Sequence, residues 1–438
     1  MPSFSCWFSP SASEISTSRL SLDFDLRAAD LFFRELVAPG LGRIWFARQI
    51  SWPLAAIALH EELTNDGWNA PKPTTISHGI EALGCKLENL GRRGRADRSR
   101  RLLGSRAFAR DDSQNVWSFG LLSQAKNYVR NTHRQASTRA LRTEGGLGFA
   151  QGSRFDLLEL EPIGRELARA FLDQHVGQGG KSLRNWLLDW IQGDEKRNVQ
   201  AARGSASIKT ALSPERPTNE ERAIVRARLL DTSNAESDKR LRLSRAIGNN
   251  QELPDIEDGI VVRLREAGYP SQANEILAAR GFGAVLDRAR DAVAAMTKAL
   301  DSERLGLALP ILAQDEQVEQ STADLRAAAT NYLQATDTAA VNEPYSRRFA
   351  EDIRDAENPR ILEVLVQRAE GLFALADRIV VWGSSPQIVK PTQDEEGAQD
   401  VADLEDGALS LEPDRTGRTF RIKNLHSLLR DVRPQRQG

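Results

Sequence analysis

The chain has 438 residues, of which 27% are charged and 40% hydrophobic, and this ordinary globular usage excludes wholesale disorder. Lys and Arg number 59 against 61 Asp and Glu, so the net charge of −2 identifies no partner. Two cysteines, Cys6 and Cys85, exclude a disulfide framework and a four-cysteine zinc site. No apolar run approaches the roughly 20 residues of a membrane span, and a secretion-signal pattern is lacking. We therefore expect a cytoplasmic protein that does not engage membranes.

The first 90 residues predict three helices. Residues 27–38 form an apolar-periodic stretch that ends at Pro39 and Gly40. A second helix is expected over 52–65, because Pro53 is tolerated in a first turn. A third is expected over 73–89, with Thr75 or Ser77 as its N-cap.

Residues 117–175 have a more specific pattern. Residues 117–143 predict two helices that are broken around Asn131 and Thr132. Residues 145–150 and 155–161 predict two strands joined by a tight turn over 151–154, and Pro162 then begins a helix. The predicted order is helix, helix, β-hairpin, helix.

This order, with RALRTEGGLGF at 139–149 and LEPIGREL at 160–167, resembles the winged-helix domain of bacterial MarR-like regulators. In that family the hairpin is the wing and an L-T-x-x-G-R-x-L segment follows it, where this chain has Glu161 in place of threonine. The resemblance covers residues 117–172 and implies that the helix including Thr132–Arg142 recognises DNA. A packing module of the same shape is the alternative.

Basic residues concentrate in one segment. Residues 86–142 hold fourteen basic and four acidic side chains, and arginine is well suited to bidentate phosphate contacts. We expect these side chains to position nucleic-acid phosphates without reading sequence, although a solvated face would have the same composition. The predicted contacts are Arg92, Arg93, Arg95, Arg98, Arg100, Arg101, Arg106, Arg110, Lys126, Arg130, Arg134, Arg139 and Arg142.

Domain organisation is predicted from composition. Residues 1–192 form an N-terminal module, and 193–222 have few large apolar side chains, as is typical of a linker. Residues 223–438 form a second helical module. Its helices are expected over 221–245, 257–300, 316–336, 344–356 and 359–378, with a stop at Gly268 and a restart at Pro270.

The end of the chain changes character. Residues 378–383 and 420–423 read as strands, and they flank a segment with nine acidic and no basic side chains at 394–414. This acidic segment is expected to be a solvated loop. An alternative is that it occupies the arginine cluster when nucleic acid is absent.

Catalytic signatures are missing from the sequence. It has no P-loop, no dinucleotide-binding glycine motif, no nucleophile elbow and no HExxH, so we expect no cofactor and no metal site. A metal-dependent nuclease would need converging carboxylates. Asp156, Glu159 and Glu161 share one predicted strand, but no lysine follows them.

Residues 20–175 also resemble one uncharacterised bacterial family encoded in anti-phage and restriction gene clusters. The similarity rests on GLGRIWFARQISWPLAAIALHEEL at 40–63, the Arg-rich run, and VWSFGLL at 116–122. It implies a defence role and supplies no catalytic residues. The sequence thus predicts a mostly α, non-enzymatic subunit that engages duplex DNA beside other subunits of a bacterial system. A protein-interaction scaffold and a nuclease are the alternatives.

Overall fold

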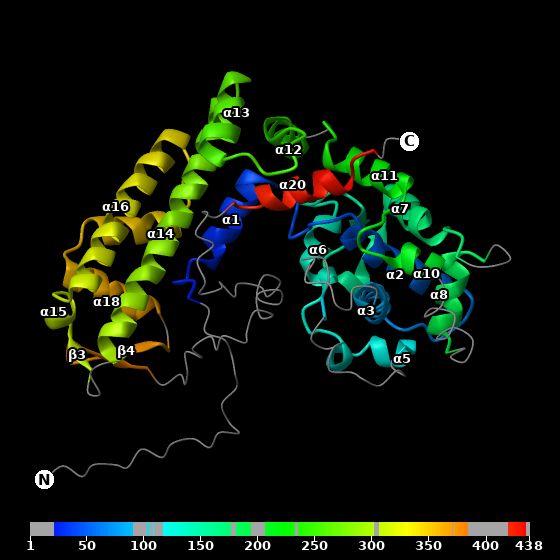
Figure 1. Cartoon of the computed structure of the whole chain (residues 1–438), viewed down its shortest axis with the longest axis horizontal. Coiled ribbons are helices and arrows are strands. Elements are labelled where there is room, and N and C mark those ends of the chain that lie inside the picture. Colours follow the sequence, from blue (N-terminus) through cyan, green and yellow to red (C-terminus); the bar gives the residue numbers. More distant parts are fainter. Residues whose placement is uncertain are drawn as a thin grey trace, which may run out of the picture. The chain divides into compact units, whose positions relative to one another are not determined.

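The protein is mostly helical and has two small antiparallel sheets, as a computed structural model shows (Figure 1), so the predicted mostly α fold is confirmed. Within the part of the chain that the structure describes, none of the helices is long and apolar enough to cross a bilayer. The described residues are 22–90, 103–104, 108, 117–176, 181–193, 206–232, 235–301, 306–369, 371–383 and 419–434.

The chain forms two compact units that interleave in sequence. Unit 1 comprises Met1–Asp30 and Gly281–Gly417, and unit 2 comprises Leu31–Arg280 and Arg418–Gly438. Two of the three boundaries fall inside helices, α1 (Arg27–Val37) and α14 (Pro270–Asp301).

The predicted linker over 193–222 is folded in its described part. Helix α10 (Ala206–Leu212) buries Ile208 and Leu212, and it packs on α3 (Pro73–Leu90). Residues 206–222 therefore lie within unit 2, and the two observed units do not divide there. Two apolar side chains one helical turn apart are enough to hold this segment, although its average composition is polar.

Helix α2 (Arg48–Asn65) is the centre of unit 2. It packs against α3, α7 (Pro162–Leu172) and α6 (His133–Leu141), and most of its side chains are buried, including Trp52 at 1% exposure. It begins four residues before the predicted start. Unit 2 also contains α5 (Phe119–Leu122), η1 (Ala125–Asn127) and α8 (Leu183–Ile191).

Prolines begin two of these helices. Pro162 opens α7 as predicted, and Pro73 opens α3, so the expectation of an N-cap at Thr75 or Ser77 is wrong. Proline has the backbone φ of a helix and lacks an N–H that the first turn could not use. The break predicted around Asn131 and Thr132 is confirmed, because α6 begins directly after Thr132.

The stretch predicted to be one helix over 221–245 is two helices, Asn219–Leu229 and Ala235–Ile247, whereas the next part of unit 2 follows the prediction. Gly268 adopts φ +83° after α13, and Pro270 opens α14, as expected. The segment before them contains a π-helical turn, η3. The bounds are α11 (Asn219–Leu229), α12 (Ala235–Ile247), η3 (Ile256–Val261) and α13 (Val262–Glu266).

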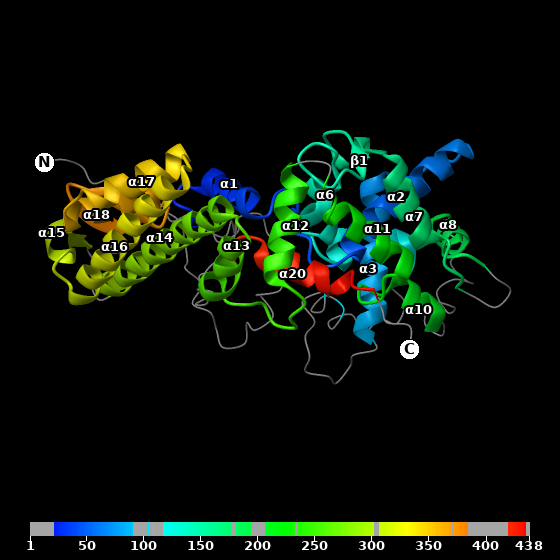
Figure 2. The same cartoon turned by 90° about the horizontal axis from the view of Figure 1, so that it is seen from above.

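The prediction of a strand over 420–423 is wrong. Phe420 and Arg421 have positive φ, and α20 (Ile422–Asp431), red in Figure 1, begins immediately after them. The helix forms because Ile422, Leu425 and Leu428 recur at helical spacing and are buried. Figure 2 shows α20 beside α12, with which it is in contact.

A buried ion pair holds the start of α2. The Arg48 Nε lies 3.0 Å from Oε1 of Glu221 on α11, and both side chains are fully buried. Arg48 also donates to the carbonyl oxygens of Ala211 and Arg216, and its guanidinium lies 4.7 Å from the centre of the Phe171 ring. Burial lowers the pKa of Arg48 from its usual value, and the charge of Glu221 opposes this shift.

Two long helices form the frame of unit 1. Helix α16 (Glu316–Ala339) runs beside α14 in both views (Figures 1 and 2), and a Cβ on Gly281 would lie 3.1 Å from the Tyr332 Cα. This glycine therefore permits close approach of the two backbones. Helices α17 (Pro344–Arg354) and α18 (Asn358–Arg368) complete the unit's helical part.

A three-stranded antiparallel sheet completes unit 1. Its order is β3 (Leu307–Ala308), β5 (Ile379–Trp382), β4 (Phe373–Ala376), and α15 (Leu309–Leu312) follows β3. Strand β5 confirms the expectation at 378–383. The helix predicted over 359–378 ends earlier, at Arg368, because Gly371 takes φ +79° and the chain turns into β4. The acidic segment 394–414 lies outside the described residues.

Candidate nucleic-acid interface

Helix α6 is fixed by a carboxylate from another helix. The N–H of His133 donates to Oε1 of Glu81 at 2.8 Å, and the N–H of Arg134 donates to its Oε2 at 3.2 Å. Glu81 lies on α3, so α3 supplies the acceptors that the first turn of α6 lacks. The N–H of Thr132 donates to Gln135 Oε1 at 3.0 Å, which completes the start of the helix.

Glu81 is buried among neutral donors. Its side chain is 1% exposed, and the Tyr128 hydroxyl donates a third hydrogen bond to Oε1 at 3.0 Å. Burial raises the pKa of Glu81 from 4.5 to about 7, although these hydrogen bonds and the charge of Arg134 act in the opposite direction. The carboxyl group therefore changes protonation near neutrality.

Two further ionisable groups lie beside Tyr128. Its hydroxyl also contacts the Cys85 sulfur at 3.3 Å, and burial raises the pKa of that thiol to about 12. Burial, with a smaller contribution from Arg134, lowers the pKa of His78 to about 4. The thiol therefore stays protonated and the imidazole neutral at neutral pH.

The outward face of α6 is polar and basic. Ala136, Ala140 and Leu141 are buried, whereas Gln135 and Arg139 are exposed. Arg139 has its Nε 3.5 Å from Oε1 of Glu35, yet half of its side chain is accessible. The helix therefore presents long polar side chains to solvent on the side opposite its core contacts.

A short hairpin follows α6 and is bonded to its end. Strands β1 (Ala150–Gln151) and β2 (Glu159–Leu160) pair antiparallel, and Arg142 forms a bridge with Ala150. The predicted strands at 145–150 and 155–161 are thus mostly turn, with a 3₁₀ turn η2 (Phe155–Leu157) between β1 and β2. Gly152 has φ +129°, which supports the predicted turn at 151–154.

The far end of the hairpin is held against the helices. The Asp156 carboxylate accepts hydrogen bonds from the Thr74 N–H at 2.8 Å and the Thr74 hydroxyl at 2.9 Å. Phe155 lies beneath Arg134, whose guanidinium is 5.0 Å from the ring centre. The loop therefore folds back on α3 and α6, and exposed Arg154 lies at its turn.

The predicted contact residues fall into three groups. Lys126 and Arg130 are exposed and make no hydrogen bond or ion pair with other described residues, and Arg139 is half exposed. Arg134 and Arg142 are half-buried, and burial lowers the pKa of Arg134, so Arg134 serves first to pack on Phe155. The third group, Arg92, Arg93, Arg95, Arg98, Arg100, Arg101, Arg106 and Arg110, lies outside the described residues.

The carboxylates considered for a nuclease are not brought together as a site. Asp156 caps the start of α3, and Glu159 is exposed on β2. Within the described ranges, no three His, Cys, Asp or Glu side chains gather in a way that could hold a metal ion.

Sequence analysis missed Glu81. It lies one residue from the apolar stripe of Ile80 and Leu83, and a carboxylate there reads as a solvated side chain. Ser77 and Cys85 lie one helical turn before and after Glu81 and are small and uncharged. They are the sequence signal that the face of α3 with Glu81 is buried.

No protein-family model, curated protein or solved structure matches this chain.

Proposed function

We propose that the chain is a non-enzymatic subunit that binds duplex DNA through unit 2, with the outward face of α6 toward the nucleic acid. The observation that carries the proposal is the two-sidedness of α6. Its inner side is buried on α2 and α3, and its outer side presents Gln135 and Arg139. Polar and basic side chains on one helix face suit both phosphates and base edges.

Flanking cations support the same surface. Lys126 and Arg130 precede α6 and are exposed, and Arg154 follows at the turn of the hairpin. The capping contacts from Glu81 hold α6 in place before any ligand arrives. A recognition helix fixed in advance loses less conformational entropy on binding. The defence role implied by the family resemblance is part of the same proposal.

The experiment measures the affinity for a labelled DNA duplex across a series of salt concentrations. Each neutralised phosphate contributes about 0.9 to the slope of log affinity against log salt. Changing Lys126, Arg130 and Arg139 together to alanine should weaken binding and flatten the slope by up to about 3. The matched control is Arg245→Ala, an exposed arginine on α12 of the same unit, which should leave the slope unchanged.

Two results would contradict the proposal. If the affinity of the wild-type protein for the duplex does not fall with salt, this face has no role in DNA binding. A triple variant that binds like the wild type, with an unchanged melting temperature, moves any nucleic-acid site away from α6.

A further inference from the structure

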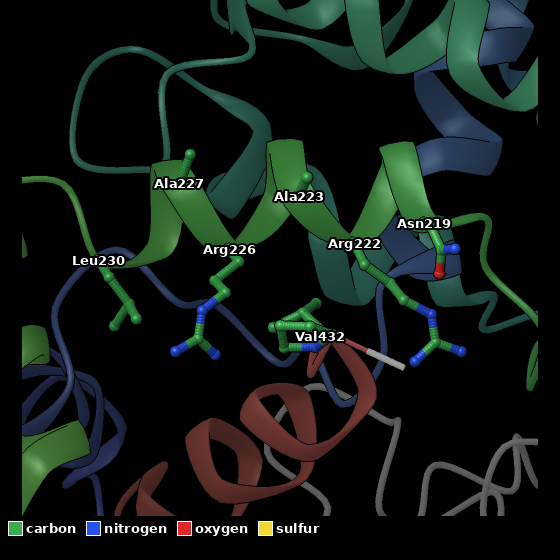
Figure 3. Close-up of a pocket in the computed structure, with 8 residues that line it drawn as sticks. Asn219, Arg222, Ala223, Arg226, Ala227, Leu230 and Val432 are labelled. Carbon is green, nitrogen blue, oxygen red and sulfur yellow. The ribbon is translucent and has the colours of Figure 1, made fainter. Parts of the chain in front are cut away.

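A groove on unit 2 lies between α11 and the end of α20, apart from the α6 face. It has a volume of about 580 Å³. In Figure 3 the side chains of Arg222 and Arg226 extend from α11 on the side where Val432 lies, at the end of α20, and Asn219 lies near the start of α11. The residues that line it are Asn219, Arg222, Ala223, Arg226, Ala227, Leu230, Val432 and Pro434.

The groove combines small apolar surfaces with positive charge. Ala223 and Ala227 on α11 and Val432 after α20 provide the apolar surfaces, and none of the described residues that line it carries a carboxylate. The Arg226 guanidinium makes no hydrogen bond or ion pair with the other described residues. An adjoining hollow of about 280 Å³ differs, because Glu215 and Asp431 line it together with Arg222 and Arg430. Only the larger groove is therefore selectively cationic.

Arg222 keeps this groove in shape. Its Nε donates to the Pro217 carbonyl at 3.1 Å, and its Nη1 donates to the carbonyls of Asp431 at 2.7 Å and Arg433 at 3.4 Å. All three acceptors are neutral, so they fix the guanidinium without cancelling its charge. They also tie the end of α20 to the start of α11, which makes the groove walls pre-organised.

We propose that this groove binds an acidic peptide segment of a partner protein. A carboxylate of the segment pairs with Arg226 in the two-pronged geometry that arginine favours, near the positive charge of Arg222. Aliphatic side chains of the same segment lie on Ala223, Ala227 and Val432. A nucleic-acid strand fits less well, because it has no aliphatic side chains for the apolar surfaces. This site goes beyond the proposed DNA binding and uses different residues.

The test measures fluorescence anisotropy of a labelled peptide in which glutamates alternate with leucines, titrated with the full-length chain. Saturable binding is expected, and Arg226→Gln should weaken it about tenfold, as loss of a charge-assisted contact does. Ala223→Asp places a like charge in the groove and should weaken binding as well. Arg245→Gln, at an exposed arginine of α12, should change the affinity less than twofold.

Four results would overturn the proposal. One is the absence of saturable binding of the glutamate–leucine peptide at concentrations up to about 1 mM, which means a binding free energy weaker than about −4 kcal/mol. A second is equal binding of a peptide with lysine in place of glutamate. A third is an Arg226→Gln variant that binds the peptide like the wild type while keeping its melting temperature. The fourth is loss of duplex DNA binding in Arg226→Gln, which would assign the groove to nucleic acid. DNA binding that fails only in the Lys126, Arg130 and Arg139 variant leaves the peptide site untouched.

Discussion

Two of the buried carboxylates of unit 2 are held in opposite ways. Glu221 faces the Arg48 guanidinium at 3.0 Å, so its charge is neutralised where it lies. Glu81 accepts its hydrogen bonds from a tyrosine hydroxyl and two backbone N–H groups, and the charge of Arg134 offsets only a small part of the effect of burial. Both receive good hydrogen bonds, yet burial raises the pKa of Glu81 to about 7. Hydrogen bonds from neutral donors thus do not replace a counter-charge in a dry interior.

The largest effect is expected from breaking the charged pair. Arg48→Met leaves the Glu221 carboxylate buried without a cation, and this should cost about 3–5 kcal/mol of unfolding free energy. Chemical denaturation of the wild type and the variant measures the difference. Adding Glu221→Gln to Arg48→Met should recover part of the loss, and a double variant less stable than the single one would contradict the role of the pair.

The lowered pKa of His78, about 4, makes the folded protein less stable as the pH falls. The second effect is the opposite pH dependence expected from Glu81. Its pKa is raised in the folded protein, so the folded state binds a proton more tightly than the unfolded chain does. This contribution to stability is fully present below pH 4.5 and is lost as the pH rises through about 7. The total is roughly 3 kcal/mol. The wild-type advantage over Glu81→Gln in denaturation midpoint should therefore shrink between pH 4.5 and 8, because His78 contributes equally to both proteins. A difference between the two proteins that does not change with pH would contradict this assignment.

A smaller effect isolates one neutral donor. Tyr128→Phe removes the hydroxyl that donates to Glu81 and should cost about 1 kcal/mol at pH 7. It should also raise the pKa of Glu81 and so shift the loss of stability to higher pH, because the ionised carboxylate loses a hydrogen-bond donor. Thermal unfolding at two pH values tests both parts. An unchanged pH profile would mean that the Tyr128 hydroxyl does not stabilise the ionised form of the Glu81 carboxylate.

The smallest effect concerns the exposed cap of the same helix. Gln135→Ala removes the acceptor for the Thr132 N–H, and since water can replace it, the cost should be about 0.5–1 kcal/mol. The loss should not vary between pH 5 and 8. A pH-dependent loss would show that the two caps of α6 are coupled.

The sequence predicted what depends on local signals. Pro162 and Pro270 begin helices where expected, and the break before α6 follows from Thr132. It missed what depends on distant partners. Glu81 is recognisable as a cap only once α6 is known to lie against α3. Residues 420–423 taken alone have the composition of a strand. The apolar spacing that continues to Leu429 is what indicates the helix α20.

The candidate interface divides in the same way. The exposure of Lys126, Arg130 and Arg139 agrees with their polar sequence context, whereas the packing of Arg134 on Phe155 does not follow from it. The contact of Arg134 with the Phe155 ring joins residues twenty-one positions apart, and such a tertiary contact cannot be predicted from composition.

The hydrogen bond from the Ala47 N–H to the Asp431 carboxylate at 2.8 Å has a consequence for how the protein is made. It joins positions 384 residues apart, and the whole of unit 1's larger segment is translated between them. Unit 2 therefore cannot close while its C-terminal helix is still inside the ribosome. Residues 31–280 must wait through the synthesis of more than a hundred further residues, which favours slow folding and dependence on chaperones.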